Sequence, residues 1–487
     1  MADGPTIHDV CVVGAGISGL NALVVASGYL PRSARAVLVD ARPRPGGMWV
    51  DTYDYVRLHQ PHPIFTAGNI RWQLDAAPSH LASRSEVLDH LRHCLDVAAA
   101  KMVVDERFGW TYLGHLERDG LVDVELRAPD GSTHRVLTRR LVTSFGHQVR
   151  PNPPLSTTST RIRGITPETL DLAAVRASEA PVWIVGGGKT AMDTAHRLLT
   201  EIPGCDVHLL AGPGTIFARR DTFFPTGARR WWAGTPVNTM AREVSDRFDG
   251  TNEAEVREWF RSTYGVGPVP DARDYFGAYL SEAENRVIAA GLRTVERAYF
   301  TDAVDRGDGE VDMVDRDGRS RTTPAGSWIV NCTGSLLRSD HPYQPYASAT
   351  GNVLSIQMRS STFGGFSSFA GYFMTHLMFR DRLRDVPLYE LDIAELHRKA
   401  PPVVIYASMV LTLHNLGLLI DTLPKRVLLQ CGLDYNLWYP VPRQVAGLTR
   451  LLATHRRKRS HDQRTLDTIG ARFGVRCGPI EWTAAAS

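Results

Sequence analysis

The sequence has few cysteines, and their positions exclude a dithiol redox centre or a cysteine-rich metal site. Its six cysteines are scattered and form no Cys-x-x-Cys pair: Cys11, Cys94, Cys205, Cys332, Cys431 and Cys477. The N-terminal MADGPTIHDV also lacks the basic and apolar regions of a secretory leader. These absences predict a cytoplasmic protein, with no bound metal and no disulfide redox centre.

The chain also lacks an excess of charge and an unambiguous membrane span. It carries 55 Lys and Arg against 52 Asp and Glu, a net charge of +3, which gives no general attraction to nucleic acid. The longest apolar stretch, residues 402–420, contains His414 and Asn415 and is at the lower limit of length for a span. We therefore expect a buried helix there, no transmembrane segment and no nucleic-acid partner.

The chain does have the material for several hydrophobic cores. With 487 residues, of which 43% are hydrophobic, it is too long for one ordinary core, and two or three packed units are expected. Past Pro440 the sequence predicts an amphipathic basic helix on the surface.

A first nucleotide site is predicted near the N-terminus. The apolar run DVCVV, residues 9–13, leads into GAGISG, residues 14–19, which is a complete G-x-G-x-x-G. Gly14 permits a tight turn, Gly16 lets a pyrophosphate approach the backbone, and Gly19 lets the next helix pack on the strand. A second apolar run then ends in Asp40, at the spacing where a carboxylate binds ribose hydroxyls.

The stretch IVGGGKTAMD, residues 184–193, fits two kinds of phosphate loop. Gly-Lys-Thr is typical of ATPases, but that pattern needs a glycine where this chain has Trp183. As a dinucleotide crossover, Gly186, Gly188 and Ala191 fill the three small-residue positions. The next strand ends in Ala211 without a carboxylate, which favours NADPH and leaves NADH open; an arginine pair at 219–220 could receive the 2'-phosphate.

Residues after Asp40 carry a family resemblance. The stretch RPRPGGMW, residues 42–49, completes D-x(5)-G-G-x-W after the first glycine motif and resembles flavin-containing and Baeyer-Villiger monooxygenases. The resemblance implies FAD at the first site and an NAD(P)H domain inserted in the FAD domain. Two apolar strands that end near Gly146 and Gly334 stand where this family has its connections between domains.

The expected fold class is therefore α/β, with two Rossmann-like dinucleotide-binding domains and a helical C-terminal extension. We expect an FAD-binding domain in residues 1–151 and 332–395, an NAD(P)H-binding domain in residues 152–331, and a helical region in residues 396–487. The predicted cofactor-binding residues are Gly14, Gly16, Ser18, Gly19, Asp40, Arg42, Gly47, Met48, Trp49, Gly146, Gly186, Gly188, Lys189, Thr190, Ala191, Arg219, Arg220 and Gly334.

Candidate catalytic residues follow the Gly-Gly-x-Trp motif. By resemblance to the Baeyer-Villiger enzymes, Arg57, His59 and Gln60 are expected beside the flavin, with His59 where an aspartate is usual. A histidine there would transfer a proton or only hydrogen-bond the ring. Aromatic side chains at 223, 224, 231 and 232 are candidates for an apolar substrate pocket.

The sequence departs from the family at one signature. IRGITPE, residues 162–168, lacks both the phenylalanine and the histidine of F-x-G-x-x-x-H. The expected function is an FAD-dependent, NAD(P)H-using monooxygenase that oxygenates a small organic molecule with molecular oxygen, through a flavin peroxide adduct. An FAD reductase or dehydrogenase without oxygen insertion is the alternative, and a binding protein with inactive nucleotide folds is a third reading. The substrate and a homodimer are left open.

Overall fold

Two parallel five-stranded sheets organise the chain. The computed structural model describes residues 6–275, 277–334 and 339–480. The first sheet has the order β20-β8-β2-β3-β4, with every neighbouring pair parallel. Its strands are β2 (Val10–Val13), β3 (Arg35–Asp40), β4 (Val103–Phe108), β8 (Leu141–Ser144) and β20 (Val353–Ile356). All residues of β2, β8 and β20 are buried, as is typical of strands in a parallel sheet that is covered on both faces.

Three helices pack against the first sheet or each other: α1 (Ile17–Ala26), α2 (Arg84–Ala99) and α9 (Ser367–Met378). A capping box formed by Ser83 and Glu86 begins α2. Helices α1 and α9 cross closely, since a Cβ on Gly371 would come 2.2 Å from the carbonyl oxygen of Ser18. This contact places the N-terminus of α9 beside the first glycine loop.

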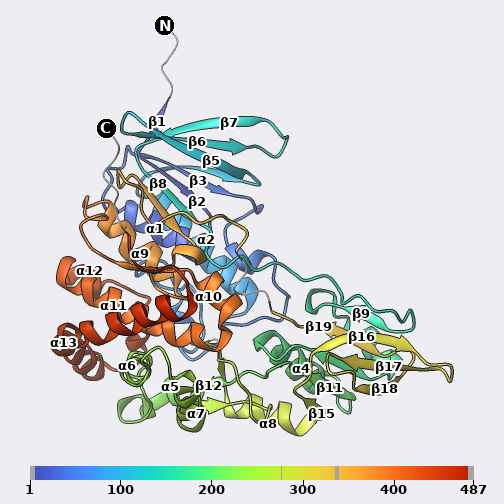
Figure 1. Ribbon diagram of the computed structural model, residues 1–487. Helices are drawn as coiled ribbons and strands as arrows, with labels where there is room; N and C mark the ends of the chain where they lie inside the picture. Colours follow the sequence, from blue (N-terminus) through green and yellow to red (C-terminus); the bar gives the residue numbers. More distant parts are fainter. Residues whose placement is uncertain (1–5, 276, 335–338, 481–487) are drawn as a thin grey trace.

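The second sheet has the order β15-β11-β10-β19-β9, again parallel throughout. Its strands are β9 (Arg163–Ile165), β10 (Val182–Val185), β11 (Val207–Leu210), β15 (Leu292–Glu296) and β19 (Trp328–Asn331). All five fall between β8 and β20 in the sequence. Helix α4 (Lys189–Glu201) follows β10, and α3 (Leu172–Ser178) and α8 (Glu282–Gly291) belong to the same part of the chain. Figure 1 shows this part extending to the lower right of the first sheet.

Small sheets accompany the two large ones. Antiparallel hairpins lie around residues 121–138 and 300–324, at Asp-Gly and Gly-Asp turns. The first group contains β1 (Ile7–His8), β5 (Thr111–Arg118), β6 (Leu121–Arg127) and β7 (Thr133–Thr138). The second contains β16 (Phe300–Asp305), β17 (Glu310–Asp315) and β18 (Ser320–Pro324), and a third β12 (Phe217–Arg219), β13 (Gly265–Val266) and β14 (Tyr279–Leu280).

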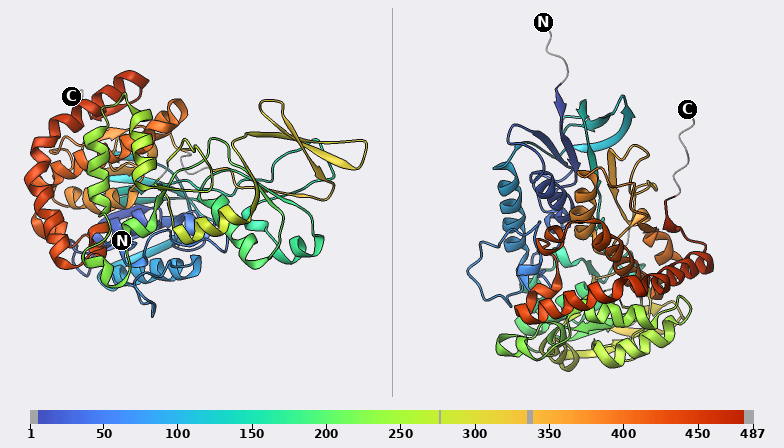
Figure 2. Two further views of the ribbon diagram at one scale, coloured as in Figure 1. Left: turned by 90° about the horizontal axis from the view of Figure 1, so that it is seen from below. Right: turned by 90° about the vertical axis from the view of Figure 1, so that its left-hand side faces the viewer.

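The remaining helices form one side of the molecule. They are α5 (Arg220–Phe223), α6 (Val237–Arg247), α7 (Glu253–Tyr264), α10 (Ile393–Lys399), α11 (Val404–Thr422), α12 (Lys425–Leu429) and α13 (Val441–Phe473); β21 (Tyr389–Leu391) pairs with β22 (Cys477–Pro479). Figure 2 shows the long α13 running across this side. Among the described residues, Pro401–Thr422 is the one helix long and apolar enough to cross a membrane, and 72% of its apolar window is buried in the protein. The predicted buried helix is thus confirmed, as is the fold class.

Candidate dinucleotide sites

The first glycine loop is held by the strands on both sides of it. The N–H of Gly14 donates to the Val39 carbonyl at 2.7 Å, and a Cβ on Gly14 would come 2.3 Å from the carbonyl oxygen of Ser144. Gly14 has φ +100°, which a side chain rarely tolerates. A Cβ on Gly19 would lie 1.8 Å from the Gly14 carbonyl oxygen. Both glycines are therefore required by the backbone itself.

The two glycine motifs of the first site lie against each other. A Cβ on Gly47 would be 2.8 Å from Gly16 Cα, and the Gly46 N–H donates to the Ala15 carbonyl at 2.9 Å. Met48 and Trp49 continue into a short 3-10 helix, Gly47–Val50. The structure thus brings together segments that the sequence separates by about thirty residues, as the motif predicts.

Asp40 lies beside this loop. It is 5% exposed, and its carboxylate accepts the Ala15 N–H at 2.6 Å and the Arg42 N–H at 2.8 Å. Burial raises the pKa of Asp40 above its usual value, although the two backbone N–H groups work in the opposite direction. The Arg42 side chain pairs with Asp51 at 2.6 Å. A carboxylate oxygen can accept more than one hydrogen bond, so Asp40 can still bind ribose hydroxyls.

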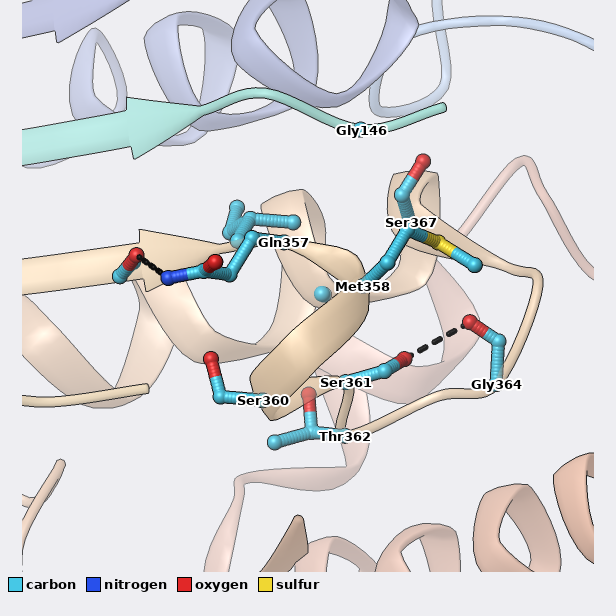
Figure 3. A pocket seen from close by; sticks show the side chains of 11 residues that line it. Gly146, Gln357, Met358, Ser360, Ser361, Thr362, Gly364 and Ser367 are labelled. Atoms are coloured by element: carbon cyan, nitrogen blue, oxygen red, sulfur yellow. Dashed lines mark hydrogen bonds between the residues drawn. The ribbon is translucent and has the colours of Figure 1, made fainter. Parts of the chain in front are cut away.

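A small hollow lies where β8, β20 and α9 meet. Figure 3 shows Gln357, Ser360 and Ser367 around it, with Gly146 on the opposite wall. Within the described part of the chain, Gln357 Oε1 and Ser360 Oγ are buried without a hydrogen-bond partner. Ser367, at the start of α9, contacts the Ser18 hydroxyl at 2.7 Å. Helix α9 begins within the small-residue run at 364–371, and its N-terminus meets polar groups that a polar ligand would satisfy.

Sequence reasoning missed Gln357 and Ser360. Their signal was the apolar strand VLSI directly before them, because side chains that follow parallel strands meet at one edge of the sheet. The glycine cradle, the buried acceptor Asp40 and these unpartnered polar atoms together fit a dinucleotide with a polar ring.

The second glycine loop has the same backbone arrangement as the first. We call this arrangement the glycine frame: the N–H of the first glycine donates to a carbonyl at the end of one neighbouring strand, and the same glycine packs on a carbonyl at the end of the other. The Gly186 N–H donates to the Leu210 carbonyl at 2.9 Å, and a Cβ on Gly186 would be 2.4 Å from the Cys332 carbonyl oxygen. A Cβ on Gly188, the N-cap of α4, would meet no atom within 4 Å. The space above this helix N-terminus is therefore open to a phosphate. Ala191 is buried in the helix, and Gly334 lies exposed after β19.

One residue distinguishes the two frames. In the first, the acceptor Val39 is followed by Asp40; in the second, the acceptor Leu210 is followed by Ala211. Ala211 therefore occupies the position of Asp40, and a methyl group cannot accept a ribose hydroxyl.

The Lys189 side chain points along α4 rather than at the glycine loop. Lys189 forms an ion pair with Asp193, one turn along α4, and the Thr190 carbonyl accepts the Thr194 hydroxyl at 2.8 Å. Asp193 also accepts the hydroxyl of Tyr53 at 2.9 Å. The segment after the Gly-Gly-x-Trp motif thus packs on the helix of the second site.

The three catalytic candidates differ in their surroundings. Arg57 is exposed and donates to the Leu81 carbonyl at 3.2 Å. Gln60 is buried. His59 Nδ1 accepts the Tyr279 N–H at 3.1 Å, and burial, reinforced by the nearby charges of Lys189 and Arg220, lowers the pKa of His59 to about 3. His59 is therefore neutral at neutral pH, and it lies at the junction between the two halves of the fold.

Arg219 and Arg220 already have carboxylate partners. Arg219 pairs with Glu282 at 3.2 Å, and Arg220 forms an ion pair with Glu284. Burial works against ionisation of Glu284, yet Arg220 and Lys189 keep its pKa below the usual value. Their role at a 2'-phosphate stays a prediction. Of the expected aromatic pocket, Phe223 and Phe224 are in a buried core, whereas the tryptophans 231 and 232 are on the surface.

Comparisons with known proteins bear on the fold. No family model and no curated protein matches the chain. The FAD-bound cadaverine monooxygenase DfoA from Erwinia amylovora is 14% identical, with a TM-score of 0.50, and the match covers 78% of this chain and 94% of that one. A flavin-containing monooxygenase from Stenotrophomonas maltophilia is 15% identical, with a TM-score of 0.47, and covers 77% and 99%. A bacillithiol disulfide reductase from Bacillus cereus is 11% identical, with a TM-score of 0.44, and covers 77% and 100%.

The fold is that of the flavoproteins with two dinucleotide-binding domains. The similarity to the Erwinia amylovora structure and the two glycine frames agree on this class. A fold alone does not identify a reaction, so the reaction has to be argued from the site.

Proposed function

We propose that this protein is an FAD-dependent, NAD(P)H-using monooxygenase of a small organic molecule. The observation that carries the proposal is the pair of equivalent glycine frames that differ at one position, Asp40 against Ala211. A chain with two copies of one frame holds two dinucleotides, and the differing residue suits FAD at the first and NADPH at the second.

The division of the chain follows the two sheets. In the proposal, residues 1–151 and 332–395 bind FAD, residues 152–331 bind NAD(P)H, and residues 396–487 are a helical region that covers one side. When bound, FAD would accept a hydride from NAD(P)H and, once reduced, react with molecular oxygen.

The residues of this chain would bind and orient the two dinucleotides. Gly14, Gly16 and Gly47 let the backbone close into the loop that would hold the FAD pyrophosphate, and Asp40 would accept its ribose hydroxyls. The N-terminus of α9 would offer backbone N–H groups to a polar ring bound beside it and would stabilise negative charge there. Gly188 leaves the N-terminus of α4 open to the NAD(P)H pyrophosphate.

His59 would serve as a neutral hydrogen-bonding group in this mechanism. Its Nδ1 already accepts the Tyr279 N–H, so the proton is on Nε2, which can donate to a bound ring or substrate. With a pKa of about 3, His59 is almost never protonated to the cation near neutral pH, so it does not act there as a cationic proton donor. Arg57 and Gln60 remain candidates for contact with substrate.

A reductase without oxygen insertion is the second candidate, because residues 162–168 lack the histidine signature. The cysteines disfavour a dithiol reductase, since all six are free and none belongs to a Cys-x-x-Cys pair. Neither candidate function needs a metal, and both functions need FAD and NAD(P)H.

The two candidates can be separated by experiment. The purified protein should have a flavin absorption spectrum that NADPH bleaches without oxygen. Incubation with NADPH, ¹⁸O₂ and candidate amines, sulfides or ketones should then give a product that gains one labelled oxygen atom in its mass spectrum. NADPH oxidation with no labelled product from any candidate would favour the reductase, and a protein that takes up no FAD would contradict both.

A further inference from the structure

The end of β11 adjoins an aromatic ring and an arginine on other strands. A Cβ on Gly212, the residue after Ala211, would lie 3.4 Å from the Tyr299 ring. The Gly212 N–H donates to the Ala298 carbonyl at 3.1 Å. Tyr299 is 46% exposed, so its ring is a wall beside the position where the second site lacks a carboxylate.

Arg316 covers this ring. Its guanidinium carbon lies 4.1 Å from the Tyr299 ring centroid, and its N–H donates to the Tyr299 carbonyl at 2.8 Å. Arg316 begins the turn between β17 and β18, so a backbone contact and a ring contact both hold it beside β11. Stacking fixes the plane of the guanidinium and leaves its N–H groups at the edge for an anion.

Two further arginines adjoin the same loop. Arg273 donates its N–H to the Pro213 carbonyl at 3.1 Å, and Arg297 Nη1 donates to the Asp271 carbonyl at 3.2 Å. In the described ranges, no carboxylate lies within ion-pair distance of the guanidiniums of Arg273, Arg297 or Arg316, in contrast to Arg219 and Arg220.

The carboxylates of this region have other partners or are buried. Asp271 pairs with Arg261, and Glu296 and Asp315 both pair with Arg321. Asp274, whose pKa burial raises, is near enough to Arg273 to be stabilised by its charge. The positive charge of Arg316 is therefore not neutralised by any of these groups.

We propose that Tyr299 and Arg316 form the subsite for the 2'-phosphate of NADPH, with Arg273 and Arg297 adding positive charge. The inference rests on the proposed function and replaces Arg219 and Arg220 as the specificity residues. In the second site the 2'-phosphate occupies the position next to Ala211 that corresponds to the Asp40 carboxylate of the first site. Arg316 neutralises the charge of this phosphate. A free 2'-hydroxyl would find no acceptor at Ala211, which disfavours NADH.

Calorimetric titration of the FAD-loaded protein with NADP⁺ and NAD⁺ tests this subsite. Arg316→Ala should weaken NADP⁺ binding by about 10- to 100-fold, the effect of one charge-assisted contact, and change NAD⁺ binding less than about twofold. Arg306→Ala is the matched control, at the opposite end of the same small sheet. Ala211→Asp should reverse the preference toward NAD⁺, as Asp40 does in the first frame.

The subsite is overturned if wild type binds NADP⁺ and NAD⁺ equally, or if Arg316→Ala leaves NADP⁺ binding unchanged or weakens both nucleotides alike. The proposed function fails by a different readout, the absence of FAD uptake or of bleaching by NADPH. If the protein selects NADP⁺ through Arg316 but oxygenates no candidate substrate, the subsite is supported and the monooxygenase proposal is contradicted.

A second observation, independent of the nucleotides, concerns the surface around the start of α13. Trp231 and Trp232 are 59% and 71% exposed, and Val441 and Val445 are 66% and 56% exposed. Trp231 and Val441 line one shallow hollow, and Arg443 Nη2 ties the two segments together by donating to the Gly234 carbonyl at 2.8 Å. We call Trp231, Trp232, Val441 and Val445 the apolar patch.

The segments that carry the patch are almost free of acidic residues. Residues 424–461 contain eight Lys and Arg and one acidic residue, the buried Asp434; residues 222–242 contain no acidic residue and three arginines. Asp421 pairs with both Arg456 and Arg459, which leaves one positive charge uncompensated, and Asp246 pairs with Lys458. Among the described residues, Arg229 and Arg450 have no ion-pair partner, and Arg230 stacks on Trp438.

We infer that the apolar patch binds the surface of an anionic phospholipid bilayer. Tryptophan prefers the interface between acyl chains and headgroups, and the surrounding arginines complement anionic headgroups. The charge balance of the two segments favours this partner over a second copy of the chain, because two copies would bring like charges together.

Co-sedimentation with vesicles tests the patch. Wild type should bind vesicles of phosphatidylcholine with phosphatidylglycerol at least about tenfold better than pure phosphatidylcholine, and added salt should reduce the binding. Trp231→Ser with Trp232→Ser should lower the binding at least about tenfold. Leu113→Ser with Leu116→Ser, exposed at 43% and 47% on β5, is the matched control.

Three results would overturn the bilayer assignment. These are no sedimentation of wild type with the anionic vesicles, equal sedimentation of the tryptophan double variant, and a homodimer by light scattering that the double variant converts to monomers without any vesicle binding. The last result would assign the patch to a second copy.

Discussion

The hydroxyl of Tyr53 donates a hydrogen bond of 2.9 Å to the carboxylate of Asp193. Tyr53 follows the first nucleotide motif and Asp193 is on the helix of the second, so this bond joins the two halves of the fold. Burial, together with the charge of Asp193, raises the pKa of Tyr53 well above its usual value. Tyr53 therefore remains a donor at every physiological pH.

We expect Tyr53→Phe to destabilise the protein by about 1 kcal/mol, the usual net effect of a lost hydrogen bond. Hydrogen exchange should increase in residues 51–60 and at the start of α4. Tyr112→Phe, which removes a hydroxyl contact to His115 inside β5, is the control and should leave those amides unchanged. Equal exchange in both variants would show that the Tyr53 bond does not join the two halves.

Gly14 and Gly188 should respond differently to alanine. Gly14→Ala would place a Cβ 2.3 Å from a backbone carbonyl at positive φ, so we expect a loss of several kcal/mol of stability. Gly188→Ala meets only open space, so its melting temperature should stay near wild type while NADP⁺ affinity falls, because the methyl takes space meant for phosphate. Thermal melts and calorimetric titration check the pair. Unchanged NADP⁺ affinity in Gly188→Ala would contradict the second site.

Asp40→Asn should weaken FAD binding. The substitution keeps the size of the side chain but replaces one oxygen that accepts the Ala15 or Arg42 N–H by an amide donor. A buried polar group left without a partner costs about 1–3 kcal/mol, so we expect about a 5- to 100-fold loss in FAD affinity. The ratio of flavin to protein absorbance after dialysis measures it. Asp51→Asn, at the exposed partner of Arg42, is the control and should retain FAD.

Because of His59, the free energy of unfolding should decrease as the pH falls below about 6.5. Its pKa of about 3 in the folded protein is below the ordinary 6.5, so between these values the unfolded chain binds more protons than the folded one. Its contribution to stability is complete above pH 6.5 and is lost as pH falls toward 3, by up to about 1.4 kcal/mol per pH unit. His59→Asn should have a shallower loss than wild type between pH 6.5 and 4.5 in urea unfolding. His134→Asn, in an exposed hairpin, should match wild type; equal slopes in all three proteins would contradict the shift.

Particular residues show where sequence reasoning succeeded. The strand, turn and helix around residues 14–19 could be placed without a structure, because they are consecutive in the chain. The same holds for Gly186, Gly188 and the buried helix at 404–422. The hairpins and the capping box at Ser83 are local features that follow from turn residues and spacing.

Other residues could not be placed in this way. The sequence offered Arg219 and Arg220 as the nearest cations after β11, but their carboxylate partners, Glu282 and Glu284, come from a helix more than sixty residues later. Tyr299 and Arg316 adjoin Gly212 only because β15 pairs beside β11 and the small sheet folds back onto it.

The sequence alone determined that this chain has two glycine-hinged crossovers and that one of them lacks the acidic residue of the other, because backbone sterics and short-range spacing specify those features. The tertiary structure decided which side chains surround them: the neutral His59 at the junction, Gln357 near α9 with its unpartnered Oε1, and the stacked Arg316 beyond Gly212. Burial and charge at these positions depend on segments distant in the chain, and no local pattern encodes where such segments meet.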